Sequence, residues 1–544
     1  MPQQAQPEAG PELLELRVLD GPNRFFTRPA IKLEFAASRP GEALRTAEAA
    51  ADAIRRLHAG LDLAPPRVVT RRSVDDRRAM VAFRWRRRSR SQAIAGAAAR
   101  IAMGSGTVAR ELRGLRAVAP GPLPALPVPR IPVVAVTGTN GKSTTTRLIA
   151  HLATAAGMRV GMTNSDGIHV RGQLVEPGDW TGFGGAARVL AEPDLELAVL
   201  ETARGGILLR GIGHAVNDVG VVTNVSADHL GLQGIDTLDE LAEVKATVVR
   251  ITRRGGWAVL NAQDARVWAM RRETRAGWYA FSLDPAAPGV AEALERGGRA
   301  AVLRDGWLVL LASGRRARRL APVEDLPVTF AGLSEHNVAN ALAAAAAADA
   351  LGIRPSRIAT GLRSFAMDSE ANPGRLNLFT REGTLVVVDF AHNEAGLGGL
   401  LRVCRALAAA GERSRPGRVR LALGTAGDRS DEVLHALGAL AGQQADDVVI
   451  CEKQHYLRGR EVETMNEIFR RGAADAGYRR AVRAYPSELD ALKALVRRAR
   501  PGDVAAVMSH AERDAIFAWL AAAGYRPMLP DELRTRLAER GSPA

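Results

Sequence analysis

Cysteine, aromatic residues and long apolar runs are all scarce in this chain. Its 544 residues include 2 cysteines, Cys404 and Cys451, which excludes a disulfide framework and a cysteine-rich metal site. Aromatic residues make up 4%, so the cores must be built from Ala, Val and Leu. No apolar run reaches the roughly 18 residues of a membrane-spanning helix, and Met1–Gly10 is polar rather than a signal core. We therefore expect a cytoplasmic protein of about three or four domains, with no membrane partner.

Lysine is also scarce, because it supplies 5 of the 74 basic residues and arginine supplies the rest. Each lysine therefore suggests a position where arginine would fail. The formal net charge of +15 indicates an acidic partner or nucleic acid. The densest basic run, Arg84–Arg90, has no nucleic-acid motif beside it. We favour a solvated strand edge or a surface for acidic ligands over a nucleic-acid interface.

The chain is organised around one stretch, Val133–Thr144, which reads Val-Val-Ala-Val-Thr-Gly-Thr-Asn-Gly-Lys-Ser-Thr. An apolar strand, a glycine turn and a helix in this order are the setting of a phosphate-binding loop. Gly138 and Gly141 let the backbone approach an anion, and the amides at the helix start point at the phosphates. Lys142 would reach the β- and γ-phosphates, and the Ser143 hydroxyl would bind Mg²⁺. The alternative is a glycine turn with an exposed lysine, which the strand-turn-helix order disfavours.

The chain divides into four parts. Residues 1–118 mix strands and helices without a chemical motif, which predicts a small α+β domain. Residues 119–132 are a proline-rich linker, expected to be extended. Residues 133–371 and 372–544 each alternate apolar strands with helices, so we expect doubly wound α/β sheets. The expected strands are 132–137, 159–163, 195–200, 218–223, 256–260 and 277–281 in the third part, and 385–390, 419–424, 447–451, 481–485 and 503–508 in the fourth.

Polar residues follow neighbouring strands of the expected central sheet. Glu201 follows the strand 195–200, and the segment 224–231 with His229 follows the next strand. Lys245 lies on the helix after that. In doubly wound sheets, ligands bind beyond the carboxyl ends of the strands. These residues therefore indicate a Mg²⁺ site beside the phosphate loop, although each taken alone would more often be a cap or a turn residue.

Several of these segments resemble the Mur ligase family, in the form found in the second ligase half of cyanophycin synthetases. They are Leu-Glu-Thr-Ala-Arg-Gly-Gly-Ile-Leu at 200–208, Thr-Asn-Val-Ser-Ala-Asp-His-Leu-Gly at 223–231 and Gly-Ile-Asp-Thr-Leu at 234–238. The resemblance covers about 131–510 and implies a P-loop central domain and a Rossmann-like C-terminal domain. Through Arg17–Asn23 the first part resembles the N-terminal domain of cyanophycin synthetases. The ATP-grasp module that follows that domain in the family has no room here.

The resemblance assigns catalytic and metal-binding roles. Lys142 would be catalytic, and Ser143, Glu201 and His229 would bind Mg²⁺. Lys245 falls where many Mur ligases carry a carbamylated lysine, which can help to hold a second Mg²⁺. Arginine cannot be carbamylated in this way, which fits the scarcity of lysine. The alternative for Lys245 is an ordinary lysine on a helix surface.

The resemblance also implies an ATP site. Arg375 would meet the phosphates and Asp389 the ribose. His336, Asn337 and Asn340 form the family's His-Asn-x-x-Asn segment beside the adenine and ribose, although polar caps on a buried helix are an alternative for the two asparagines. The full set of expected nucleotide contacts is Gly138, Thr139, Asn140, Gly141, Lys142, Ser143, Thr144, Asn261, His336, Asn337, Asn340, Arg375 and Asp389.

By this resemblance the chain would be an ATP-dependent amide ligase. It would join an amino acid, arginine in the cyanophycin synthetase half, to a carboxylate of an acidic peptide or aspartyl acceptor through an acyl phosphate. One or two Mg²⁺ ions would neutralise the developing charge, and domain closure would exclude water. A binding protein without ligase activity and a P-loop phosphohydrolase stay open as alternatives. Because the ATP-grasp module is absent, a separate ligase partner is also a possible partner of this chain. A homo-oligomer is open as well.

Overall fold

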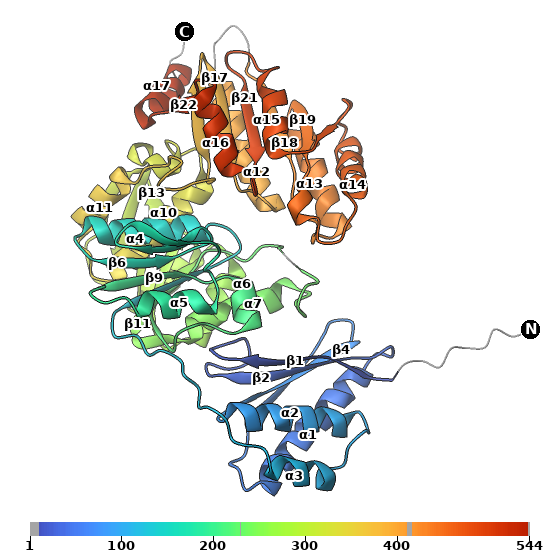
Figure 1. The fold of residues 1–544 in the computed structure, drawn as a ribbon. Coiled ribbons are helices and arrows are strands. Elements are labelled where there is room, and N and C mark those ends of the chain that lie inside the picture. The colour runs from blue at the N-terminus through green and yellow to red at the C-terminus, as the bar shows by residue number, and fades with distance from the viewer. Residues whose placement is uncertain (1–9, 229, 411–415, 542–544) are drawn as a thin grey trace, which may run out of the picture. The chain divides into compact units, whose positions relative to one another are not determined.

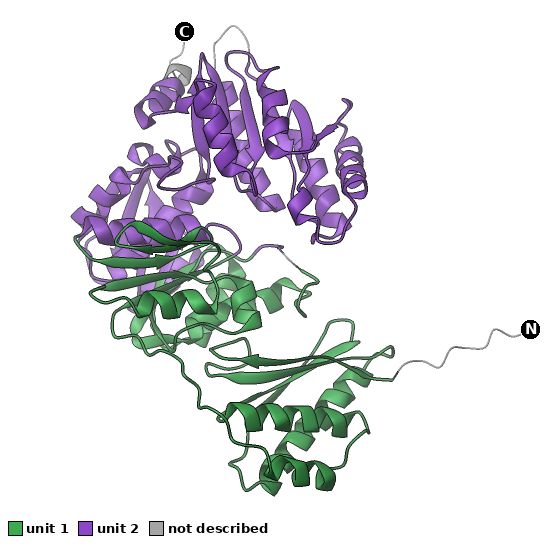
Figure 2. Ribbon diagram, in the orientation of Figure 1, with its two compact units in different colours: residues 1–138, 157–225, 230–279 green, residues 139–156, 226–229, 280–544 purple. Residues whose placement is uncertain are grey.

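The computed structural model describes residues 10–228, 230–410 and 416–541. The chain forms two compact units (Figures 1 and 2). Unit 1 comprises residues 1–138, 157–225 and 230–279, and unit 2 comprises residues 139–156, 226–229 and 280–544.

Unit 1 begins with an antiparallel sheet covered on one face by helices (Figure 1). Alternate residues of the strands point to this face, among them Leu33 and Phe35 on β2 and Val81 and Phe83 on β4, where they pack against an alanine-rich helix surface. The sheet order is β1-β2-β4-β3. The elements are β1 (Glu12–Leu19), β2 (Ala30–Ala36), α1 (Glu42–Gly60), β3 (Val68–Arg72), β4 (Arg78–Arg84), α2 (Arg88–Ala102) and α3 (Val108–Arg116).

The second part of unit 1 contains a mostly parallel sheet with strands in the order β12-β11-β10-β5-β9-β6-β7-β8. Strands β11, β10, β5, β9 and β6 are parallel, and β7 and β8 add an antiparallel hairpin. The elements are β5 (Val133–Thr137), β6 (Val160–Thr163), β7 (Gly167–Val170), β8 (Gln173–Pro177), α5 (Phe183–Leu190), β9 (Leu197–Glu201), α6 (Arg204–Leu209), β10 (Asn217–Val222), α7 (Leu238–Arg250), β11 (Thr252–Asn261), α8 (Ala265–Ala269) and β12 (Gly277–Ser282), where the chain passes into unit 2.

Unit 2 contains the helix that follows the phosphate loop, α4 (Lys142–Ala155), packed against α10 (Glu335–Ala350) and α11 (Pro355–Ser364). Between α4 and α10 in the sequence of this unit lie α9 (Pro288–Glu295) and the antiparallel strands β13 (Arg299–Arg304), β14 (Trp307–Ala312) and β15 (Arg318–Pro322). Helix α10 can pack closely because its alanines from Ala343 to Ala348 are all fully buried.

The last part of unit 2 is a second α/β sheet with strands in the order β20-β19-β18-β21-β17-β16-β22. Alternate residues of β17 enter two cores: Leu385 and Val387 face one core, and Val386 and Val388 face the other. Helices therefore cover both faces, as the sequence predicts. The elements are β16 (Asn377–Arg381), β17 (Thr384–Asp389), α12 (Glu394–Ala409), β18 (Val419–Leu423), α13 (Asp431–Gln444), β19 (Asp447–Cys451), α14 (Val462–Asp475), β20 (Arg483–Tyr485), α15 (Glu488–Val496), β21 (Val504–Met508), α16 (Arg513–Ala522), β22 (Arg526–Pro527) and α17 (Pro530–Gly541).

The predicted α/β fold class is confirmed, and every expected strand of the two sheets has its counterpart. The hairpin β7–β8 and strands β13–β15 were not predicted, because they are short and their sequences carry no motif. Residues 119–129 contain no helix or strand. Within the described ranges, no helix combines the length and the apolar character needed to cross a membrane.

Candidate active site

The first glycine of the phosphate loop closes the carboxyl end of β5. Gly138 has φ +153°, and a Cβ at this position would collide with the Thr223 hydroxyl at the end of β10. Lys245 of α7 is 2% exposed and donates a hydrogen bond from its Nζ to the Gly138 carbonyl at 2.7 Å. Lys245 is therefore buried against the loop backbone rather than lying on a helix surface.

Glu201 is the last residue of β9, a direct neighbour of β5. The strand register pairs Glu201 with Val136, two residues before Gly138. Its side chain is 4% exposed. On the other side of β5, β10 pairs Val222 with Thr137. Within unit 1, Glu201 and Thr223 therefore lie at the ends of the two strands that flank β5.

A small cavity adjoins Glu201. It is lined by residues of β6, β9 and the turns around α5 and α6, including Thr163, Glu201, Gly206 and His214. His214 is 1% exposed, and its burial lowers its pKa to about 4. The imidazole is therefore neutral at pH 7 and adds no charge beside Glu201. His214 was not predicted as a site residue, because no motif in the sequence includes it.

Asn261 and Asp264 support the segment after β10. Asn261 donates its Nδ2 hydrogen bond to the Thr223 carbonyl at 2.9 Å. Asp264 caps α8 and also accepts a hydrogen bond from the Val225 amide at 2.6 Å. Both side chains form hydrogen bonds with backbone groups. In this structure Asn261 therefore stabilises the backbone at the end of β10.

In unit 2, the helix α4 begins at the second glycine of the loop. Gly141 has φ +84°, and a Cβ there would collide with the Asn340 side chain. Asn340 Oδ1 accepts a hydrogen bond from the Thr145 hydroxyl at 3.3 Å, and its Nδ2 donates to Asn337 Oδ1 at 3.0 Å. Both asparagines are at most 5% exposed. Asn340 therefore packs against the start of α4 and is held by Asn337, and α10 has no side-chain cap.

The residues between the two glycines contact the segment before His229. The Thr139 hydroxyl donates to the Ser226 carbonyl at 3.2 Å and accepts from the Ser226 amide at 3.1 Å. Asn140 exchanges side-chain hydrogen bonds with Asn393 at 3.0 and 3.3 Å. Lys142 Nζ donates to the Thr139 carbonyl at 2.8 Å, so the loop backbone also orients this ammonium.

Arg375 lies against the start of α4. Its Nη2 donates to the Ser143 hydroxyl at 3.3 Å, and its guanidinium stacks on the Phe390 ring at 4.3 Å from the centroid. Nearby, Asn372 Nδ2 lies 3.5 Å from the Thr144 hydroxyl. The structure therefore brings Arg375 to the predicted Mg²⁺-binding hydroxyl.

Asp389 and His336 have different surroundings. Asp389 accepts hydrogen bonds from the Leu376 and Ala391 amides, each at 2.8 Å, so both of its oxygens hold backbone. His336 is exposed, with its Nε2 3.2 Å from the Ser334 hydroxyl.

A charged group in unit 2 was not predicted as a site. Asp228 forms an ion pair with Arg429 at 2.9 Å, and its other oxygen lies 3.5 Å from His392 Nε2. Arg429 is 5% exposed. All three residues lie within 131–510, the part of the chain that resembles the family, but only the fold brings them together.

A second unpredicted feature supports the segment after β17. Glu488 and Lys453 form a pair at 2.5 Å, and both side chains are 1% exposed. Burial would raise the pKa of Glu488, but the Lys453 ammonium and the His510 amide lower it to about 2. Glu488 also binds the amides of residues 510–512, and His510 Nε2 donates to the Ala391 carbonyl at 2.8 Å.

The donor set fits Mg²⁺ bound to a nucleotide better than a metal held by protein alone. Outside the masked positions, no three His, Cys, Asp or Glu side chains group as a metal site. Mg²⁺ is commonly bound by one or two protein oxygens together with water and phosphate. The Ser143 hydroxyl in unit 2 and the Glu201 carboxylate in unit 1 are each an oxygen of this kind. His229 lies outside the described residues.

Comparisons with known proteins agree with this geometry. Residues 136–348 match the Mur ligase middle domain, and residues 374–511 match the Mur ligase glutamate ligase domain. The cyanophycin synthetase of Trichormus variabilis is 40% identical over 343 residues, which are 63% of this chain and 37% of that enzyme. The UDP-N-acetylmuramoyl-L-alanyl-D-glutamate–2,6-diaminopimelate ligase of Alkalilimnicola ehrlichii is 31% identical over 397 residues, 70% of this chain and 72% of that ligase.

Among solved structures, the folylpolyglutamate synthase/dihydrofolate synthase of Yersinia pestis, complexed with AMPPNP and Mn, has a TM-score of 0.51 at 19% identity. The match covers 72% of this chain and 89% of that one. The fold, the loop and these matches together define a protein built on the middle and C-terminal domains of Mur ligases. The chain belongs to the Mur ligase family. It spans little more than a third of the length of the cyanophycin synthetase it matches.

Proposed function

We propose that this protein is an ATP-dependent ligase that joins an amino acid to a carboxylate of an acidic peptide or aspartyl acceptor, with arginine as the first candidate for the amine. The observation that carries the nucleotide-dependent step is the phosphate loop. Gly138 and Gly141 both have conformations and close contacts that exclude a Cβ, and α4 starts directly after Gly141. A helix N-terminus behind a glycine turn presents amides to phosphate.

We further propose ATP as the nucleotide and one or two Mg²⁺ ions as cofactors. A related fold binds AMPPNP and Mn. The Ser143 hydroxyl, the Glu201 carboxylate and His229 would hold one ion, and a carbamylated Lys245 would help to hold a second. When bound, Mg²⁺ neutralises the charge on the phosphates.

The proposed reaction has two displacements. A carboxylate oxygen of the acceptor attacks the γ-phosphorus, the bond to the bridging oxygen breaks, and ADP leaves. The amine nitrogen then attacks the acyl carbon, phosphate leaves with the electron pair of the C–O bond, and the nitrogen loses its proton. Lys142 and Arg375 contribute positive charge beside the phosphates, and the hydrogen bonds to Thr139 and Ser143 keep them in place.

The substrate assignment is supported by similarity and charge. The cyanophycin synthetase match covers 325 residues or more in five relatives at 40% identity or above, and a net charge of +15 favours an acidic acceptor. We propose four parts, namely residues 1–118, 119–132, 133–371 and 372–544. A separate ligase partner, a homo-oligomer and a cytoplasmic location stay predictions.

Substitution Lys142→Ala tests the loop assignment. It removes the ammonium that meets the phosphates, so phosphate release from ATP should fall below detection while the protein still folds. Phosphate release should be measured with acceptor and amine present. Unchanged release would show that the loop is wrongly assigned, and release that ignores the amine in the wild-type protein would favour the phosphohydrolase alternative.

A further inference from the structure

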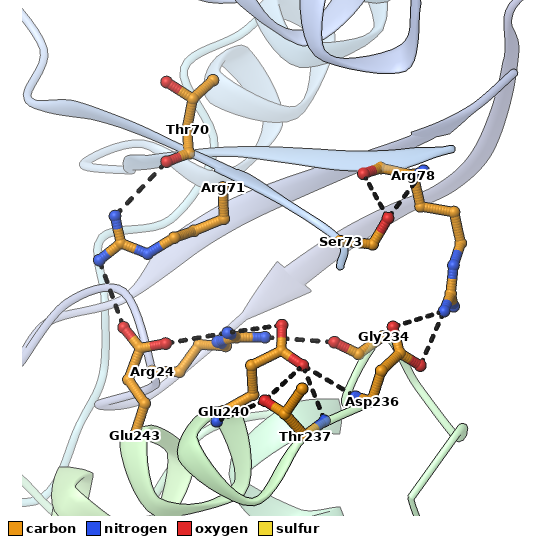
Figure 3. Close-up of polar contacts among 10 residues, drawn as sticks. All are labelled: Arg24, Thr70, Arg71, Ser73, Arg78, Gly234, Asp236, Thr237, Glu240 and Glu243. Atoms are coloured by element: carbon orange, nitrogen blue, oxygen red, sulfur yellow. Dashed lines mark hydrogen bonds and ion pairs between the residues drawn. The ribbon is translucent and has the colours of Figure 1, made fainter. Parts of the chain in front are cut away.

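The first part of unit 1 contacts the start of helix α7 through three arginines (Figure 3). Arg24 lies in the segment after β1, Arg71 on β3 and Arg78 on β4. They face three carboxylates from one short stretch of chain, Asp236, Glu240 and Glu243.

The geometry of these pairs is specific. Arg24, whose side chain is 3% exposed, reaches Glu243 at 2.9 Å and Glu240 at 3.7 Å. Arg78 Nη2 contacts both oxygens of Asp236, at 2.8 and 2.7 Å. Arg71 adds a more exposed contact to Glu243 at 3.3 Å. Charged hydrogen bonds that are partly withdrawn from water are stronger than exposed ion pairs.

Asp236 and Glu240 lie at the N-terminal end of α7, and Glu243 lies about one turn further along the helix. Asp236 precedes the N-cap Thr237, and Glu240 completes a capping box with Thr237. Acidic residues already suit this end of a helix. The arginines therefore form ion pairs with the part of α7 that the capping box already stabilises.

The opposite side of the same helix carries Lys245. At 3.6 residues per turn, two residues correspond to about 200° around the helix axis, so Glu243 and Lys245 point in nearly opposite directions. Glu243 meets Arg24, and Lys245 donates to the Gly138 carbonyl at 2.7 Å. Within unit 1, helix α7 thus contacts the first part of the unit on one side and Gly138 of the phosphate loop on the other.

Backbone hydrogen bonds also join the first part of unit 1 to the segment that follows α6. The Asp20 and Gly21 amides donate to the Arg210 carbonyl at 2.8 and 3.0 Å, and the Ile212 amide donates to the Pro22 carbonyl at 2.8 Å. The Arg250 guanidinium, at the far end of α7, donates to the Arg24 carbonyl at 2.9 Å. The first part of unit 1 therefore contacts both ends of α7.

We propose that Arg24 and Arg78 are positioning residues of the ligase: they hold α7 so that Lys245 stays on the carbonyl of Gly138. The first part of unit 1 then supports nucleotide binding without contacting the nucleotide. This inference rests on the proposed function for the role of Lys245 and the loop.

The test is a graded series at Arg78 in the full-length chain. Arg78 is only partly buried, so the variants should fold. Arg78→Lys keeps the charge, Arg78→Ala removes it, and Arg78→Glu repels Asp236. The affinity for a fluorescent ATP analogue with Mg²⁺ should fall in that order, by about tenfold for Arg78→Glu, and amide exchange in α7 should speed up in the same order. Arg72→Glu is the matched control, because Arg72 pairs with Asp76 on the surface of the same sheet.

A double-mutant cycle with Asp236→Ala separates the pair from other effects. Arg78→Ala combined with Asp236→Ala should weaken nucleotide binding no more than either change alone. A lower melting temperature with unchanged nucleotide affinity would overturn the inference, since the contact would then only add stability. If the wild-type protein bound no nucleotide, the proposed function would fail, and the exchange of α7 amides would still decide whether Arg78 holds the helix.

Discussion

At the scale of single residues, three of the five lysines donate hydrogen bonds to particular backbone oxygens. Lys142 and Lys245 each donate to a carbonyl of the phosphate loop, and Lys453 donates to the Met508 carbonyl as well as to Glu488. A guanidinium is larger and planar, and it would not fit the same place. The rarity of lysine in this chain thus agrees with where three of its lysines are found.

Lys245 can be tested by substitution and chemical rescue. Lys245→Ala should lower ATP-dependent ligation about 10- to 100-fold, because the side chain supports the loop and, if carbamylated, the second metal ion. A small carboxylate such as acetate or formate should restore part of the activity, and Lys245→Arg should be as impaired as Lys245→Ala. Full activity of Lys245→Arg would contradict carbamylation, and Lys493→Ala serves as a control for the loss of a lysine.

Gly141 can be tested against a glycine of similar conformation. In Gly141→Ala the new Cβ would meet Asn340 and tilt the start of α4, so the affinity for an ATP analogue should fall by about tenfold or more. Gly157, with φ +99°, has open space around it. Gly157→Ala should therefore lose about 1 kcal/mol of stability but keep its nucleotide affinity. Equal affinities in both variants, measured by calorimetric titration, would argue against this loop geometry.

At the scale of elements, helix α15 depends on one buried carboxylate at its start. Glu488 is charged in the folded state because its pKa is lowered from 4.5 to about 2. A lowered pKa contributes stability that is present above the unfolded value and is lost as the pH falls toward the folded value. The wild-type protein should therefore lose stability between pH 4.5 and about 2 through this group.

Glu488→Gln should remove that pH dependence. At pH 7 the variant should be less stable by about 3 kcal/mol, because Lys453 then lies buried without a counter-charge. Between pH 4.5 and 2 its free energy of unfolding should fall less steeply than that of the wild type, as measured by urea unfolding. Glu382→Gln, at an exposed turn, is the control. A parallel pH profile in the Glu488 variant would show that the pair contributes little.

The elements also show what the sequence could predict. The parallel strands were predictable because each is a buried apolar run that ends in a glycine or a polar residue, as at Gly138 and Glu201. The hairpin β7–β8 was not, because Gln173–Pro177 is a largely exposed strand with no apolar run. The capping role of Thr237 can be predicted from its spacing to Glu240. The arginines that pair with Glu240 and Glu243 cannot be predicted from local spacing.

At the scale of the whole molecule, the unpredicted parts of the site are contacts between residues far apart in the chain. Arg24 and Glu243 are 219 residues apart, and Asn140 and Asn393 are 253 apart. Such pairs depend on how the sheets are assembled and leave no periodic signal. The family resemblance could name Lys245 and Arg375, but only the structure gives them Gly138 and Ser143 as partners.

The most direct test of the central claim is phosphate release from ATP and Mg²⁺ across a panel of aspartyl and glutamyl peptides crossed with amino acids, with the products weighed by mass spectrometry. The account predicts release only when an acidic acceptor and an amine are both present, and a product whose mass is their sum minus water. Release that ignores the amine, or turnover without such a product, would contradict it.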